Sequence, residues 1–186
     1  LDDKKAAYMD PHLVKEWNEL HLYYSSKREA NKGGYDVEAC VYESGAKVKV
    51  IDLPVGINTM FDERFPHYDG DRNTLYFSST GLTGLGGFDI FKIEGRPGAE
   101  WGKVNNMGYP VNTSFDDFSY CVIDEVRGVF SSNRTKKLYD TSFDNLFIAD
   151  FTPKPIFVRI NLEDKFSDLI EDNSWDVSYF QIELAD

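Results

Sequence analysis

Two pairs of adjacent carboxylates are the residues of this sequence with the clearest capacity for chemistry. Asp62-Glu63 and Asp116-Asp117 lie 54 residues apart, and each pair follows an Asn-Thr-x-Phe motif. Many glycoside hydrolases use two carboxylates, one as the acid and the other as the nucleophile or base. A group that recurs once per repeat has a second interpretation, because such a group usually serves the repeat itself. The acid pairs could therefore also lock neighbouring repeats together.

A second set of oxygen-bearing side chains has the spacing of the start of a calcium loop. Asp69, Asp71 and Asn73 alternate along the chain. Thr74 and Thr80 stand where a calcium loop needs Gly and Glu. Asp-Gly and Asn also favour the positive backbone angles of hairpin turns. We therefore interpret this segment as a hairpin turn and expect neither a metal nor a cofactor.

The histidines and cysteines form no cluster in the sequence. His12, His21 and His67 lack companions at metal-ligand spacing. His12 and His67 fall at equivalent inner-strand positions of the repeat described below, which favours a role in lining a channel. Cys40 and Cys121 map two repeats apart, beyond the reach of a disulfide. We expect two buried free thiols and no catalytic residue.

Three markers share a period of about 53 residues. The serine pairs Ser25-Ser26, Ser78-Ser79 and Ser131-Ser132 are 53 residues apart, and each ends a short aliphatic or aromatic run. Residues 33–36, Gly-Gly-Tyr-Asp, return as Gly-Gly-Phe-Asp at 86–89. Because Asp36 and Asp89 recur in this way, we expect them to hydrogen-bond the preceding loop, with Arg28 and Arg134 as possible donors. Short strands repeated at this period are typical of β-propeller blades.

The sequence therefore predicts an all-β fold of four-stranded antiparallel blades, belonging to a propeller of six to eight blades. The three units span residues 10–63, 64–117 and 118–151 within a partial propeller at 1–151. Residues 152–186 are either a last partial blade or the start of a small β-sandwich domain. Predicted strands are 12–20, 20–26, 35–42, 47–53, 64–68, 74–79, 88–94, 101–107, 118–123, 127–132, 145–151, 156–160 and 179–184. Closed propellers need roughly four to eight blades, so we expect another chain or another segment to supply the rest.

Charge narrows the range of partners. The formal net charge is −12, which repels nucleic acid and anionic membrane surfaces. No apolar run approaches the roughly 20 residues of a membrane span. We expect no nucleic-acid partner and no insertion of this segment into a membrane.

The longest loops should emerge on one side of the blades, which we call the loop face. It receives residues 27–32, 54–63, 80–85, 109–117 and 133–141. Rigid strands that carry variable loops are a common platform for recognition. The candidate binding residues on this face are Arg28, Asp62, Glu63, Asp116, Asp117 and Arg134.

Several segments resemble the propeller repeats of OmpA-family cell-envelope proteins of Bacteroidetes, a TolB-like, WD40-like class. They are Asp-Arg-Asn-Thr-Leu-Tyr-Phe-Ser-Ser (71–79), Gly-Leu-Gly-Gly-Phe-Asp-Ile-Phe (84–91), Met-Gly-Tyr-Pro-Val-Asn-Thr (107–113), Asp-Asp-Phe (116–118) and Phe-Ser-Ser-Asn-Arg (130–134). The resemblance implies a periplasmic, outer-membrane-associated protein similar to components linked to type IX secretion. It also implies a small regulatory-like β domain after the propeller.

From these observations we expect a non-catalytic module for protein–protein interaction. Its partners would be other envelope proteins or the remaining part of its own propeller. The alternative is a glycan-binding or glycoside-processing propeller with an acidic central site. The paired acids would be the basis of that alternative.

Overall fold

The computed structural model describes residues 6–16, 19–28, 33–43, 47–134, 144–152, 156–160 and 175–180, and every regular element among them is a β-strand. The strands are β1 (Ala7–Glu16), β2 (Glu19–Lys27), β3 (Asp36–Glu43), β4 (Lys47–Ile51), β5 (Glu63–Asp69), β6 (Thr74–Ser79), β7 (Asp89–Glu94), β8 (Asn105–Asn106), β9 (Asp117–Val122), β10 (Arg127–Ser132), β11 (Asn145–Asp150), β12 (Ile156–Ile160) and β13 (Trp175–Phe180). The predicted all-β class is confirmed. Contacts divide the chain into two compact units, Leu1–Asp150 and Phe151–Asp186.

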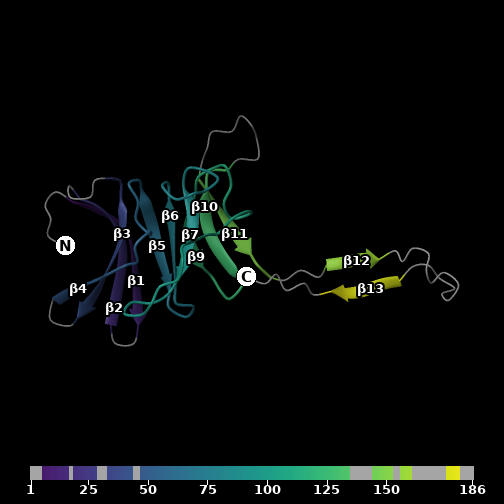
Figure 1. The fold of residues 1–186 in the computed structure, drawn as a ribbon, viewed down its shortest axis with the longest axis horizontal. Helices are drawn as coiled ribbons and strands as arrows, with labels where there is room; N and C mark the ends of the chain where they lie inside the picture. Colours follow the sequence, from purple (N-terminus) through teal and green to yellow (C-terminus); the bar gives the residue numbers. More distant parts are fainter. Residues whose placement is uncertain are drawn as a thin grey trace. The chain divides into compact units, whose positions relative to one another are not determined.

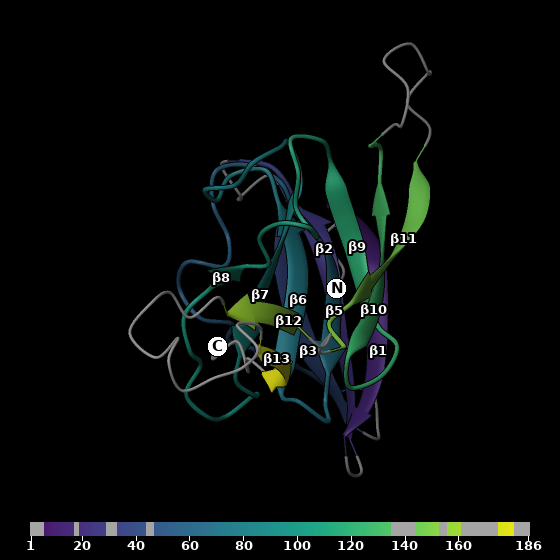
Figure 2. The same ribbon diagram turned by 90° about the vertical axis from the view of Figure 1, so that its right-hand side faces the viewer.

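Antiparallel sheets make up the first unit. Sheet I has the strand order β1-β2-β3-β4, sheet II the order β5-β6-β7-β8, and sheet III the order β11-β10-β9. Figure 1 shows these sheets stacked in chain order, and Figure 2 shows the same stack after a quarter turn. The first strands of the sheets, β1, β5 and β9, contact one another in that order. The second unit contains the hairpin β12-β13.

Alternating side chains make each sheet two-sided, and two apolar cores fill the spaces between the sheets. Sheets I and II enclose a core that includes Tyr23, Leu75 and Phe77. The rings of Tyr23 and Tyr68 stack across this boundary with centroids 5.0 Å apart. Sheets II and III enclose a second core with Tyr76 and Phe130. Burial of aromatic and β-branched side chains on both sides thus stabilises sheet II most.

The serine pairs lie in the second strand of each sheet, which is where the repeat places them. Ser25-Ser26 lie in β2, Ser78-Ser79 end β6, and Ser131-Ser132 end β10. In the register of each sheet, Ser26 faces Tyr8, Ser79 faces Glu63 and Ser132 faces Asp117. These pairings define which residues of the sheets are structurally equivalent.

Each first strand contains a bulge that the sequence did not indicate. The pairing of the first two strands shifts register near Asp10 in sheet I, near Phe65 in sheet II and near Ser119 in sheet III. These residues have positive φ angles of 53°, 56° and 58°. A bulge inserts one unpaired residue and bends its strand. The repeated bulge thus bends all the first strands at the same level.

Several predicted strand limits are wrong. The first strand ends at Glu16 and not at residue 20, because Leu20 already belongs to β2 and pairs with Lys15. The predicted outer strand at 101–107 is reduced to Asn105–Asn106, because only these two residues pair with β7, opposite Lys92 and Phe91. The last strand is Trp175–Phe180, shifted from 179–184; residues 181–184 lie outside the described residues. Whether 152–186 form a partial blade or a separate domain stays a prediction.

Candidate functional site

The loop between β4 and β5 ties sheet I to sheet II through side-chain hydrogen bonds. The Asn58 side chain accepts a hydrogen bond from the Val37 amide at 2.8 Å and donates one to the Val37 carbonyl at 2.9 Å. Asn58 therefore extends the edge of β3 as a further strand residue would. Next to it, Thr59 donates from its amide and its hydroxyl to the Glu63 carboxylate, at 2.7 and 2.8 Å. Ser79, at the end of β6, donates to the same carboxylate at 2.6 Å.

The loop between β8 and β9 repeats this arrangement between sheets II and III. Asn112 pairs with the amide and carbonyl of Ile90, both at 2.8 Å. Thr113 donates from its amide and hydroxyl to the Asp117 carboxylate, at 2.6 and 2.8 Å. The other oxygen of Asp117 receives Arg134 Nη2 at 2.5 Å. We call each set of Asn, Thr and acid, with its partners, a carboxylate latch.

The first acid of each pair holds the glycine-rich loop of the preceding sheet. Asp62 Oδ1 accepts the Tyr35 amide at 2.9 Å, and Asp116 Oδ1 accepts the Phe88 amide at 2.8 Å. A Cβ atom on Gly87 would lie 2.2 Å from the Asp116 carboxylate. The Gly-Gly step therefore recurs because the next loop packs directly against its backbone.

The buried carboxylates of the two latches accept hydrogen bonds from different kinds of donor. Glu63 and Asp117 are both fully buried. Glu63 has only neutral donors, and burial raises the pKa of its carboxyl while the bonds from Ser79 and Thr59 oppose that rise. Asp117 is one methylene shorter and receives the long side chain of Arg134. At the position equivalent to Arg134, sheet II has Gly81, where a Cβ atom would lie 2.0 Å from the Thr59 hydroxyl.

Arg28 does not match its sequence equivalent Arg134. It forms an ion pair with Glu38 of β3 and lies over the Tyr8 ring, 5.9 Å from the ring centroid. Tyr8 occupies the position of the latch acid in sheet I. Among the described residues, neither Arg28 nor Arg134 donates a hydrogen bond to the recurrent aspartates Asp36 and Asp89. Those guanidinium groups contact Glu38 and Asp117 instead.

The predicted role of Asp89 is confirmed. Its Oδ2 accepts the amides of Leu85 and Gly86, both at 2.9 Å, so it fixes the loop that precedes β7. Burial raises the pKa of this carboxyl. The corresponding loop residues 29–32, before Asp36, lie outside the described residues.

Apolar side chains stand exposed on the loops that the latches hold. Met60 is 75% exposed, Phe61 59% and Phe115 41%. Leu85, on the neighbouring loop of sheet II, is 58% exposed. Phe61 and Phe115 are equivalent residues, and the backbone amide of each donates a hydrogen bond to the threonine hydroxyl of its own latch, at 3.0 and 3.3 Å. The available sequence signal was the recurrence of Phe61 and Phe115 among polar residues, which did not by itself single them out as exposed.

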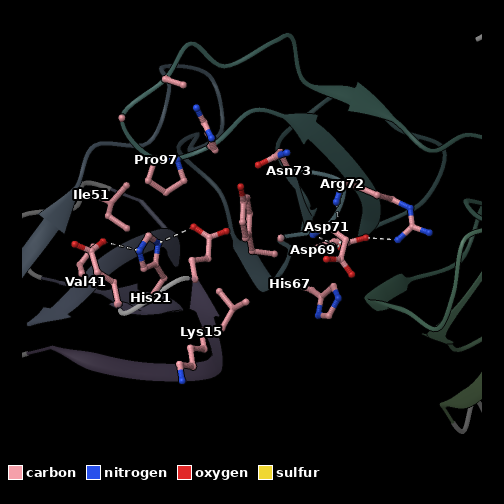
Figure 3. Close-up of a pocket in the computed structure, with 18 of the residues that line it drawn as sticks. Lys15, His21, Val41, Ile51, His67, Asp69, Asp71, Arg72, Asn73 and Pro97 are labelled. Atoms are coloured by element: carbon pink, nitrogen blue, oxygen red, sulfur yellow. Dashed lines mark hydrogen bonds and ion pairs between the residues drawn. The ribbon is translucent and has the colours of Figure 1, made fainter.

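The opposite end of the sheets has a cleft of about 1440 Å³ (Figure 3). The hairpins of all three sheets contribute to it, and its lining contains both signs of charge, including Lys15, Glu16, Lys49, Asp71, Arg72 and Glu125. His21 lies buried between Glu16 at 3.5 Å and Glu19 at 3.2 Å. The sequence did not indicate this cleft, because its lining comes from strands and hairpins that lie far apart in the chain.

The hairpin interpretation of residues 69–73 is confirmed. Asp69 Oδ1 accepts the amides of Asp71 and Arg72, and its other oxygen pairs with Arg72 at 2.5 Å. Asn73 has a φ of 49°. The sheet III hairpin uses the same device, since Asp124 accepts the Arg127 amide and pairs with its guanidinium. These carboxylates stabilise turns.

Three side chains lie next to one another across the first strands of the sheets: His12 of β1, His67 of β5 and Cys121 of β9. The two imidazole rings lie 4.4 Å apart, and Cys121 Sγ lies 3.4 Å from His67 Nδ1. The Val122 amide donates to His67 Nε2, so the neutral ring carries its proton on Nδ1, facing the sulfur. Burial lowers the pKa of His67 to about 4 and raises that of Cys121. Such a pair favours the neutral thiol and not an activated nucleophile.

Both cysteines are free thiols, as expected, but only Cys40 is buried. Cys121, in β9, is exposed, which corrects the expectation of two buried thiols. In the part of the chain that the structure describes, no group of three His, Cys, Asp or Glu side chains is arranged to hold a metal ion. Nor do the described residues include a helix long and apolar enough to cross a membrane.

Comparison with known proteins shows a distant structural likeness. No protein-family model matches the chain, and no curated protein matches it. Among solved structures, a chain described as the crystal structure of alpha-L-arabinofuranosidase from Lactobacillus brevis is similar, with 11% sequence identity and a TM-score of 0.49. The match covers 80% of this chain and 53% of that chain, so this chain spans about half the length of that enzyme. A likeness this distant gives no basis for assigning a function.

Proposed function

We propose that this chain is a segment of a β-propeller that serves as a non-catalytic protein-interaction module of a bacterial envelope protein. Its binding surface is the part of the loop face that presents Met60, Phe61, Leu85 and Phe115. The carboxylates that were predicted to contact a partner have an indirect role. They hold the loops that present these apolar side chains. Partners are other envelope proteins, in keeping with the resemblance to OmpA-family propeller repeats.

The observation that carries this proposal is the exposure of equivalent aromatic residues on loops that are fixed by buried bonds. Phe61 and Phe115 are 59% and 41% exposed, although each lies two residues before a latch acid that is fully buried. A side chain held in place before binding loses less conformational entropy on contact, which favours affinity. Aromatic residues and Met are also enriched in the cores of protein interfaces. The surface therefore has the composition of a recognition site.

The carboxylate pairs offer little to the alternative, a glycan-binding or glycoside-processing propeller. Both oxygens of Glu63 and both oxygens of Asp117 accept hydrogen bonds from within the protein. A glycosidase needs one acid that protonates the leaving group and a second that is free to attack or to activate water. Acids committed to Thr, Ser and Arg donors do not meet that need.

The test is capture of envelope proteins by the immobilised chain, with identification by mass spectrometry. The double variant Phe61→Ser and Phe115→Ser should remove a specific partner, because the substitutions delete exposed apolar area and leave the latches intact. Ile123→Ser is the matched control, since Ile123 is 51% exposed but lies in the hairpin at the opposite end of sheet III.

Three outcomes would count against the proposal. Capture of no partner, or equal capture by the double variant and the wild type, would contradict binding by this part of the loop face. Saturable binding of an oligosaccharide in calorimetry, at a site insensitive to the double variant, would favour the glycan alternative.

A further inference from the structure

We propose that the cleft at the hairpin end of the sheets binds a lysine or arginine side chain from a peptide segment of a partner protein. The bound group lies where sheet I meets sheet II. Glu16 and His21 accept its charged end, and apolar side chains of the cleft hold its alkyl part. This site is at the opposite end of the sheets from the loop face, so it goes beyond the proposed function.

The cleft forms because the strands of sheet I extend further than those of sheet II. In sheet II the pairing of the first two strands ends where Asp69 faces Thr74, and the equivalent pair in sheet I is Val14 and His21. Sheet I continues for two further residue pairs. No strand of sheet II lies opposite this extension. The turn of sheet II and the loop between β7 and β8 line the cleft beside it, so both walls belong to neighbouring sheets of the chain.

His21 and Glu16 place two hydrogen-bond acceptors next to one another in this cleft. His21 is 4% exposed, and its hydrogen bond joins Nε2 to Glu19 Oε2 at 3.2 Å. In the neutral ring the proton therefore lies on Nε2, and Nδ1 carries a lone pair. Nδ1 is buried without a hydrogen-bond partner, and Glu16 Oε2 lies 3.5 Å from it (Figure 3). Both atoms lack a donor, and a buried acceptor without a donor costs stability.

The Glu16 carboxylate is open to an incoming cation. Its side chain is 22% exposed, and no described residue donates a hydrogen bond to it. The other oxygen, Oε1, points to the turn of sheet II, where a Cβ atom on Gly70 would lie 3.2 Å away. Glycine at that position leaves this oxygen uncovered. Because hydrogen bonds from a cation to a carboxylate are stronger than neutral ones, an ammonium or guanidinium group fits these acceptors best.

Apolar side chains flank the acceptors. Val14, Ile51 and Trp101 line the cleft, and each is partly buried against the core between sheets I and II. The Trp101 ring is fixed on the backbone of Gly95, where a Cβ atom would lie 2.7 Å from it. Lysine and arginine combine an alkyl part that packs on apolar surface with a charged end that needs acceptors. Tryptophan is also the best aromatic partner for a cation.

Charge and size favour a cation that is carried by a peptide. Seven carboxylates and four lysine or arginine side chains line the cleft, so its net charge is negative. One of the four cations, Arg72, is already paired with Asp69. The volume of about 1440 Å³ exceeds the roughly 1,000 Å³ of the largest typical small-molecule pockets. Residues on either side of the bound side chain therefore fit in the cleft as well.

The first experiment titrates isotope-labelled protein with the peptide acetyl-Gly-Gly-Arg-Gly-Gly-amide and follows the backbone amide signals by NMR. Salt at about 0.15 M screens unspecific attraction to the acidic chain. Saturable shifts should appear at Glu16, Gly70 and Gly98, which line the cleft from different elements. The same peptide with citrulline, a neutral analogue of arginine, should leave these signals in place. The double variant Phe61→Ser and Phe115→Ser should bind the arginine peptide as the wild type does, so failure here is distinguishable from failure of the proposed function.

Two outcomes of this titration would overturn the inference. One is equal binding of the citrulline and arginine peptides, because the site would then not select a cation. The other is the absence of saturable shifts at the cleft, which is the result expected if a doubly protonated His21 alone satisfies Glu16 and Glu19.

The second experiment compares variants that should keep the fold. Glu16→Gln should weaken binding of the arginine peptide about tenfold, since the carboxylate loses its charge. Glu100→Gln is the matched control, because it makes the same charge change at an exposed residue that does not line the cleft. Ala99→Arg should abolish binding, because Ala99 is exposed at the cleft and the new guanidinium group competes for the site. Equal affinities of the two glutamine variants, or undiminished binding by Ala99→Arg, would refute the cation site.

Discussion

Replacing each latch acid by its amide should cost more stability in one latch than in the other, because the two carboxylates have different donors. Asp117→Asn keeps the size of the side chain, but turns an amide NH₂ group towards either Arg134 or the donors of Thr113. Arg134 then loses its buried counter-charge. Its side chain is 20% exposed and still contacts Ser132 and two backbone carbonyls. We therefore expect the lower end of the cost of breaking a buried ion pair, about 3 kcal/mol.

Glu63→Gln should cost less, because Glu63 has no cationic partner to leave behind. One hydrogen bond from Thr59 or Ser79 is lost, which destabilises by about 1 kcal/mol. Burial already raises the pKa of the Glu63 carboxyl, so a neutral side chain also avoids part of the cost of burying a charge.

Thermal unfolding followed by circular dichroism measures the difference between these variants. For a chain of this size, about 1 kcal/mol corresponds to a change in Tm of about 2–4 °C. Asp117→Asn should thus lower Tm by about 6–12 °C and Glu63→Gln by about 2–4 °C. The control is Asn105→Ala, at an exposed position on the outer strand β8. A loss for Glu63→Gln equal to or larger than that for Asp117→Asn would refute the argument that the latches use different chemistry.

The remaining predictions concern a histidine, two glycines and the thiols. The pKa of His67 is lowered to about 4, so stability present above pH 6.5 should be lost as the pH falls towards 4. In the variant His67→Gln, the free energy of unfolding measured with urea should depend less on pH over that range. Gly86→Ala should destabilise by about 1–3 kcal/mol, because its Cβ would lie 1.9 Å from a backbone oxygen, whereas Gly102→Ala, at 3.4 Å, should not. In dilute native protein a thiol reagent should label Cys121 and spare Cys40 until unfolding; prompt labelling of both would contradict the burial of Cys40.

The period of the sequence predicted the strand positions well because hydrophobic alternation and turn residues act locally. Residues 74–79 and 127–132 form the strands expected of them. The bulges were not predictable in this way. Residues as different as Asp10, Phe65 and Ser119 adopt the same positive φ, because the pairing of neighbouring strands imposes it and the residue type does not.

The site was predictable in part for the same reason. Recurrence of the acid pairs correctly raised the interpretation that they lock neighbouring units, and the bonds of Asp62 and Asp116 to the preceding sheets have that effect. The sequence did not show which donor completes the hydrogen bonding of each latch. Gly81 and Arg134 are equivalent positions, and only the packing around Thr59 explains why one sheet needs no side chain there.

In sheet I, residues at positions equivalent to those of sheet III make different polar contacts. With Tyr8 in place of a latch acid, Ser25 Oγ, Ser26 Oγ and Arg28 Nε are buried without hydrogen-bond partners among the described residues. Unsatisfied buried groups cost stability, so sheet I should be the weakest of the three around its second strand. In sheet III an arginine at the same position is held by Asp117, and the difference lies in one residue of the facing strand. A repeat thus preserves backbone positions, while the polar network at each position is set by the residue that it happens to face.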